Sequence, residues 1–128
     1  MYKRVLVPID GSDIADRALD EAINFTKGYP VEMKIVFIGD DDENSRQVID
    51  LAMSRAEKAG VRPENGLLGK LETEEIADVI LQEAKAWPAD VIVMGTHGRR
   101  GMAHMFLGSV AEGVIRASPV PVLVIRGP

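Results

Sequence analysis

Cysteine is missing from this sequence of 128 residues, and only two histidines are present. A chain without thiols can form no disulfide, no thiolate metal site and no cysteine nucleophile. Two histidines without any cysteine also argue against a zinc site, which needs a complete set of nitrogen, sulfur or oxygen ligands. The absence of cysteine suits a reducing compartment.

Basic residues are few relative to acidic ones, since 15 Lys and Arg stand against 20 Asp and Glu, a net charge of −5. Nucleic-acid binding needs a basic face, so this balance does not favour it. No apolar run approaches the roughly 20 residues of a membrane helix, and no signal segment precedes the first run. We expect a cytoplasmic protein without membrane insertion. The acidic stretch 40–43 is interpreted as a solvated loop that opens a helix, with a metal site as the less favoured alternative.

Five short apolar runs alternate with longer amphipathic segments, and this order is the main signal for the fold. The runs cover residues 5–9, 33–38, 66–68, 90–94 and 120–125. Except for the weak third run, they are rich in Val and Ile without polar alternation, which is typical of parallel strands buried on both faces. The sequence therefore predicts one α/β domain, residues 1–128, built on an open, doubly wound parallel sheet.

The segments between the runs carry apolar residues at helical spacing and begin at short polar or acidic residues. Ser12 or Asp13 is expected to cap the first helix and Thr73 the third. The last helix is expected from about Ser109 to Ala117. In a sheet of this kind these helices cover both faces.

A glycine-rich segment, residues 95–101, follows the fourth run, which is where open α/β sheets bind their ligands. Glycines let the backbone approach a ligand closely, and successive N–H groups make a concavity that binds anions. Gly108 and Ser109 then open the last helix, whose first N–H groups lack partners. A Gly-x-x-Gly alone is a weak signal, but this spacing between a buried strand and a helix start is stronger. It predicts a phosphate site, to which Arg99 and Arg100 would add charge.

At this point the sequence resembles the universal stress protein family along essentially its whole length. Residues 5–12, VLVPIDGS, look like the first strand and turn of that family. Residues 95–98, GTHG, followed after nine residues by Gly108 and Ser109, match the pattern of its ATP-binding branch, and residues 118–125 look like its last strand. The resemblance implies a Rossmann-like five-stranded sheet of order 3-2-1-4-5, with the point of strand-order reversal between the first and fourth strands.

The resemblance also implies that ATP, accompanied by Mg²⁺, binds where the first, second and fourth strands end. By analogy the adenine lies against the end of the first strand and the backbone near the end of the second. The ribose lies near the start of the glycine segment, and the phosphates meet that segment and the helix start. The expected residues are Pro8, Ile9, Asp10, Ile38, Met94, Gly95, Thr96, His97, Gly98, Arg99, Arg100, Gly108, Ser109 and Val110.

Three of these residues have a competing interpretation or a departure from the family pattern. Asp10 could instead tie down the turn that follows it, and the two roles are weighed evenly. His97 is interpreted first as a solvated or backbone-bonded loop residue and second as a phosphate contact. Ile38 is followed by Gly39, which loosens the wall expected beside the adenine.

The sequence places no obvious catalytic base or acidic metal pair beside the glycine segment. Phosphoryl transfer needs such groups, so a nucleotide-dependent sensor or regulatory switch in the stress response is favoured, with at most slow ATP hydrolysis or phosphorylation of Ser109. The last run lies at a sheet edge, where prolines are tolerated, and it predicts a homodimer through the edge from Val120 to Arg126. The alternative is an interaction protein on the same fold that binds no nucleotide and works through dimerisation and partner binding.

Overall fold

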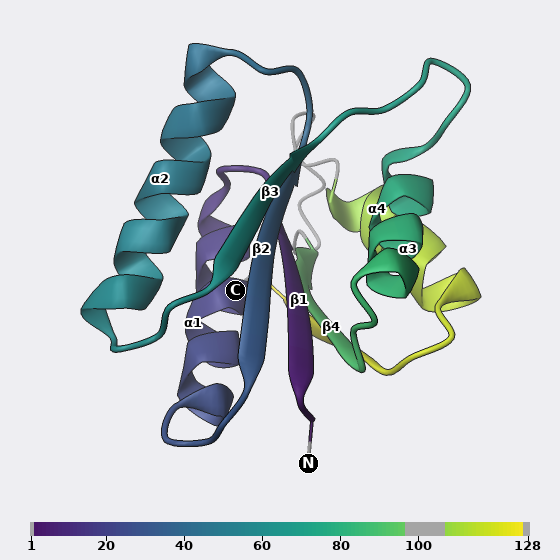
Figure 1. Cartoon of the computed structure of the whole chain (residues 1–128). Coiled ribbons are helices and arrows are strands. Elements are labelled where there is room, and N and C mark those ends of the chain that lie inside the picture. The colour runs from purple at the N-terminus through teal and green to yellow at the C-terminus, as the bar shows by residue number, and fades with distance from the viewer. Residues whose placement is uncertain (1, 97–106, 127–128) are drawn as a thin grey trace.

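The computed structural model describes residues 2–96 and 107–126, in which strands and helices alternate along the chain (Figure 1). The strands are β1 (Arg4–Ile9), β2 (Glu32–Ile38), β3 (Glu64–Leu68), β4 (Val91–Thr96) and β5 (Val122–Arg126). The helices are α1 (Asp13–Thr26), α2 (Glu43–Lys58), α3 (Ile76–Ala86) and α4 (Leu107–Ala117). Within these residues no helix has the length and apolar character needed to cross a membrane.

The strands form a single parallel sheet of order β3-β2-β1-β4-β5, which confirms the predicted fold class and strand order. Helices α1 and α2 lie on one face of the sheet, and α3 and α4 lie on the other (Figure 1). The strand order reverses between β1 and β4. Their pairing covers Val5 with Val91 and Leu6 with Ile92, and it stops well before the carboxyl ends of both strands. The residues predicted for the site at the ends of β1 and β4 therefore flank the reversal point of the sheet.

The two central strands carry the core, because helices cover them on both faces. From Val5 to Ile9, and from Val91 to Gly95, every residue is buried. The edge strand β5 differs from the predicted doubly buried strand, since its residues are half-buried or exposed. It also begins at Val122 rather than residue 120, after the prolines at 119 and 121, which lack the N–H that a strand pairing needs.

The helix boundaries confirm one predicted cap and correct another. Ser12 caps α1 as expected, accepting the Ala15 N–H at 3.2 Å. Thr73 does not cap α3, which begins after Glu75, and the Asp78 carboxylate accepts the Glu75 N–H at 2.9 Å. Residues 71–74 form a separate turn instead, in which the Glu74 carboxylate accepts the Leu71 N–H at 2.8 Å.

The acidic stretch opens α2 as predicted, because Asp42 caps that helix. Its carboxylate accepts the Ser45 N–H at 2.8 Å. The hydrogen bonds from Ser45 lower the pKa of Asp42 below its usual value, since they favour the ionised carboxylate. Helix α4 begins at Leu107, earlier than the predicted Ser109, which places Ser109 inside the first turn.

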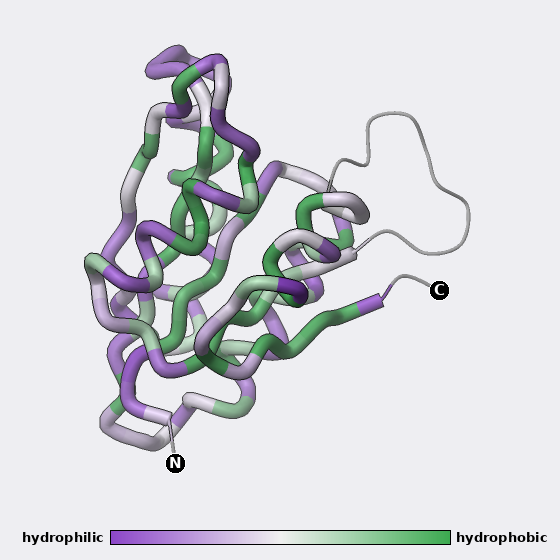
Figure 2. Tube along the Cα trace, turned by 90° about the vertical axis from the view of Figure 1, so that its right-hand side faces the viewer, coloured by the Kyte–Doolittle hydropathy of each residue, from purple (hydrophilic) through white to green (hydrophobic). Residues whose placement is uncertain are grey.

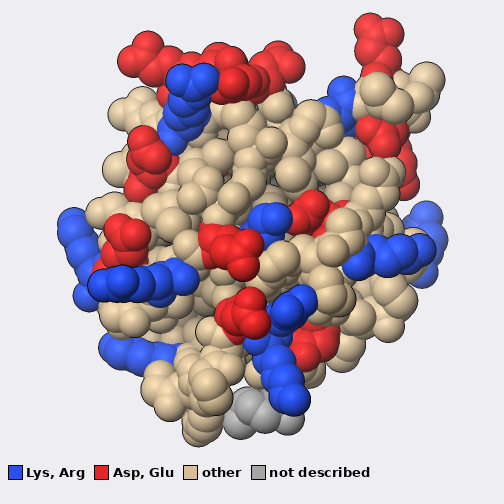
Figure 3. Space-filling model, in the orientation of Figure 1, with Lys and Arg blue, Asp and Glu red and all other residues tan. Residues whose placement is uncertain are grey.

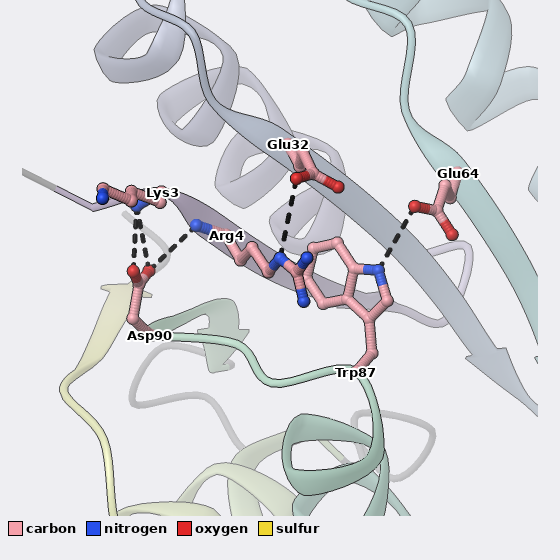
Figure 4. A network of polar contacts seen from close by, with 6 residues as sticks. All are labelled: Lys3, Arg4, Glu32, Glu64, Trp87 and Asp90. Carbon is pink, nitrogen blue, oxygen red and sulfur yellow. Dashed lines mark hydrogen bonds and ion pairs between the residues drawn. The ribbon is translucent and has the colours of Figure 1, made fainter.

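Polar contacts join the strands and the loops at the amino end of the sheet (Figure 4). The Asp90 carboxylate accepts the Lys3 N–H at 2.9 Å and the Arg4 N–H at 3.0 Å. The Arg4 guanidinium lies 5.7 Å from the centre of the Trp87 ring and 3.6 Å from the Glu32 carboxylate. These contacts fasten β1 to the segment that leads into β4.

Candidate functional site

The turn after β1 is fixed by its own side chains. Asp10 accepts the Ser12 N–H at 2.9 Å, which is the turn-forming role weighed against an adenine contact. Gly11 has a φ of +85°, a conformation that favours glycine. Pro8 and Ile9 are buried just before this turn. The turn role of Asp10 is confirmed, and the adenine contact stays a prediction.

The end of β4 is less loop-like than the sequence suggested, because Gly95 and Thr96 continue the strand and pair with Ile125 and Arg126 of β5. The Met94 side chain is fully buried, so only its backbone could face a ligand. A Cβ on Gly95 would lie 2.8 Å from the Ile14 carbonyl oxygen. Glycine at this position therefore lets α1 pack against the strand, whatever else it does.

The first turn of α4 brings the last three predicted residues together. Gly108, Ser109 and Val110 follow Leu107 directly and lie in the first turn of α4, at the positive end of the helix dipole. The Val110 side chain is buried, with 7% exposed, and can offer a ligand only its main chain. Such a turn attracts anions through its N–H groups and its partial positive charge.

A pocket of about 520 Å³ lies between this turn, the end of β4 and the edge strand β5. Its volume is within the range of about 300–1,000 Å³ that small-molecule sites occupy. The main residues of its wall are Thr96, Gly108, Ser109, Glu112, Val124 and Arg126. Three of these, Glu112, Val124 and Arg126, were not predicted as site residues. The period of two along a strand, which puts Val124 and Arg126 on one face, is the signal that could have found the last two.

Several of the other predicted residues lie apart from this pocket, and four lie outside the described residues. Of the described residues, Pro8, Ile9, Asp10 and Ile38 lie at the ends of β1 and β2 and do not line it. Ile38 is half-buried, and the Gly39 N–H beside it donates to the Leu68 carbonyl at 2.9 Å. His97, Gly98, Arg99 and Arg100 lie outside the described residues.

Acidic side chains dominate the rest of the carboxyl end of the sheet. In Figure 3 they gather over the start of α2 and over the loop between β3 and α3. Burial raises the pKa of Asp16 above its usual 3.8, the charge of Arg55 opposes that shift, and Asp13, Asp20 and Asp10 add to it. A phosphate bound at this end would therefore need local cations to offset the surrounding negative charge.

The parallel sheet of order β3-β2-β1-β4-β5 defines a doubly wound α/β protein, and a pocket lies at the carboxyl ends of its strands β4 and β5. The chain belongs to the universal stress protein family, whose family model matches residues 1–126. It is 31% identical to universal stress protein MJ0531 of Methanocaldococcus jannaschii, over 100% of this chain and 84% of that protein.

Two solved structures with the same fold contain nucleotides. A universal stress protein in complex with cAMP superposes with a TM-score of 0.79 at 28% identity, covering 97% of this chain and 96% of the other. The universal stress protein of Archaeoglobus fulgidus in complex with dAMP gives a TM-score of 0.77 at 28% identity, covering 97% and 98%. Both ligands are adenine nucleotides with one phosphate.

Proposed function

We propose that this protein binds an adenine nucleotide, ATP with Mg²⁺, and acts in the cytoplasm as a nucleotide-dependent sensor or switch in the stress response. The observation that carries the proposal is the pocket formed by Thr96, the first turn of α4 and the edge strand β5, at the carboxyl end of the sheet. The nucleotides held by the cAMP and dAMP complexes support it.

The described residues suit the phosphate end of the ligand best. Gly108 has no side chain that would fill the pocket, and it lies in the first turn of α4, where the positive end of the helix dipole favours an anion. The ends of β1 and β2 are where the adenine is proposed to lie, against Pro8, Ile9 and Asp10 and near the Ile38 backbone. Gly95 lies between the two regions, where the ribose is proposed.

In this proposal Mg²⁺ is bound mainly by the phosphates of the nucleotide, and not by a complete set of protein ligands. In the described part of the chain, no group of three or more His, Asp or Glu side chains is arranged to hold a metal ion. Mg²⁺ in nucleotide sites keeps several waters and binds phosphate oxygens with one or two carboxylates. Glu112 is the carboxylate that lines the pocket, and it would hold the ion.

The partner proposal rests on the edge strand β5. Its apolar residues continue to the C-terminal end of the sheet (Figure 2), and Leu123 is 41% exposed. An open apolar edge invites pairing with another chain, and we propose a homodimer through Val120 to Arg126. Sedimentation at micromolar concentration should give a dimer. Leu123→Lys should shift the protein to monomer, and the matched change Asn65→Lys on the opposite edge strand should not.

Isothermal titration with ATP and Mg²⁺ tests the nucleotide proposal against the rival, an interaction protein that binds no nucleotide. We expect saturable heat with ATP, and weaker binding of adenosine, which lacks the phosphates. Absence of heat with ATP, AMP and adenosine would leave the rival standing. Measuring phosphate release in the same samples tests whether bound ATP is hydrolysed, and we expect at most slow turnover.

A further inference from the structure

Arg126 reaches the pocket by the geometry of the sheet rather than by its position in the sequence. It pairs with Thr96 across β4 and β5, and paired residues of a parallel sheet point to the same face. Gly95, one residue before Thr96, faces α1, because a Cβ there would meet Ile14. Thr96 and Arg126 therefore face α4, in agreement with their place in the wall of the pocket.

Two other described cations near this end of the sheet are already bound. The Arg46 guanidinium lies 2.7 Å from the Asp41 carboxylate. The Lys70 ammonium donates to the carbonyls of Glu74 at 2.9 Å and Leu71 at 3.1 Å. Among the described residues, no hydrogen bond or ion pair holds the Arg126 guanidinium. It is the described cation that lines the pocket, and its side chain stands out from the face of the sheet, whereas pairing in the proposed dimer would use the backbone edge of β5.

We propose that Arg126 is a phosphate-binding residue, supplied to the pocket by the edge strand β5. The inference rests on the proposed function and adds a residue that the glycine motif does not contain. Guanidinium groups bind phosphates through paired N–H donors. The surroundings favour such a cation, because the Glu112 carboxylate in the same pocket repels any phosphate oxygen from which Mg²⁺ does not separate it.

The competing interpretation is that Arg126 only ends an edge strand and keeps it soluble. The two interpretations differ in whether Arg126 contacts the phosphates of the nucleotide. A phosphate contact affects ATP and leaves adenosine unchanged, whereas a structural role affects both or neither. A phosphate contact is also weakened by salt, because it depends on charge.

The experiment titrates ATP and adenosine, in low and high salt, into the wild type and three variants. Arg126→Gln removes the charge, Arg126→Lys keeps the charge but loses the paired donors, and Arg116→Gln removes a matched exposed arginine of α4 that does not line the pocket. We expect Arg126→Gln to weaken ATP about tenfold, the effect of one charge-assisted hydrogen bond. The ATP affinity of Arg126→Lys should fall between those of the wild type and Arg126→Gln. Arg116→Gln should bind ATP as tightly as the wild type, and all four proteins should bind adenosine equally.

The outcomes separate this inference from the proposed function. If the wild type binds ATP and Arg126→Gln binds it equally well, the role of Arg126 is wrong while nucleotide binding stands. An equal loss of ATP and adenosine, or a loss that tracks dissociation of the dimer in sedimentation, also overturns it. If the wild type binds neither ATP nor adenosine, both the proposed function and this inference are wrong.

Discussion

The amino and carboxyl ends of the sheet are built in opposite ways. At the amino end, Asp90 holds the backbone N–H groups of Lys3 and Arg4 at the start of β1, and the Trp87 Nε1–H donates to Glu64 of β3 at 3.3 Å. Arg4 lies between Trp87 and Glu32 (Figure 4). At the carboxyl end, the β1–β4 pairing stops early, and the start of α4 and Arg126 border a pocket.

This contrast suggests that the two ends have different tasks. Side chains at the amino end satisfy one another and contribute to stability. At the carboxyl end, buried or crowded acids such as Asp16 oppose stability, and the cation of the pocket has no described partner. Binding sites are often less stable than they could be, because groups that serve a ligand are not used to hold the fold.

The largest effect should follow from closing the pocket. Gly108→Val should weaken ATP binding about 100-fold, because a side chain there would keep the phosphates from the main-chain donors, each worth about 1.5–3 kcal/mol when it binds a charged group. Helical Val is no worse than helical Gly, so the fold should persist. Titration calorimetry measures the affinity. The control is Gly69→Val, at an exposed position where a Cβ would meet nothing within 4 Å.

Removing the polar contacts at the amino end should lower the stability of the fold without changing the affinity for ATP. Asp90→Ala removes the acceptor for the Lys3 and Arg4 N–H groups and should lower the free energy of unfolding by about 1–2 kcal/mol. Urea unfolding measures this loss, and Asp50→Ala, an exposed helical site, should stay within about 0.5 kcal/mol. A change in ATP affinity for Asp90→Ala would contradict the division between the two ends.

A smaller effect is expected for Trp87→Phe. The substitution keeps a ring beside Arg4 but removes the Nε1–H that donates to Glu64, and the site is partly exposed. We expect a loss of about 0.5–1 kcal/mol in the free energy of unfolding. Circular dichroism should follow the transition, because Trp87 is the only tryptophan of the chain. A loss as large as that of Asp90→Ala would mean that the packing of the larger indole ring contributes more to stability than its hydrogen bond to Glu64.

The smallest effect concerns the pH dependence at the carboxyl end. Because the folded pKa of Asp16 is raised, the stability linked to its proton is present below its usual pKa of 3.8 and is lost as the pH rises through the raised value. The stability of Asp16→Asn relative to the wild type should therefore increase from pH 3 to pH 7, by about a few tenths of a kcal/mol after solvent screening. A relative stability that stays constant or falls over this range would contradict the burial of Asp16.

Much of the fold could be predicted because Val and Ile runs are strong signals for buried parallel strands. The end of β4 could not, since Gly95 and Thr96 resemble loop residues and only the packing of Ile14 shows why glycine continues the strand. The cap of α3 was missed because Glu74 forms its own turn and moves the helix start past Thr73. Local residue preferences do not reveal such competition between neighbouring side chains.

The candidate site was predicted only where a motif runs along the chain. Gly108 and Ser109 follow one another and line the pocket, whereas Val110, the next residue, is buried in the core. Arg126 comes to the same pocket through strand pairing with Thr96, a contact that depends on register across the sheet. From the sequence we predicted only a dimer contact for Arg126, because the residues next to it in the chain do not show which residue of β4 pairs with it.

The most direct test is an amide NMR titration of the isotope-labelled protein with ATP and Mg²⁺. The account predicts that the amide signals of Thr96, Gly108, Ser109, Val110 and Arg126 shift together on saturation. The signals of Lys3, Arg4 and Asp90 at the amino end should stay in place. Shifts centred on the amino end, or no shifts at saturating ATP, would contradict a nucleotide site at the carboxyl end of the sheet.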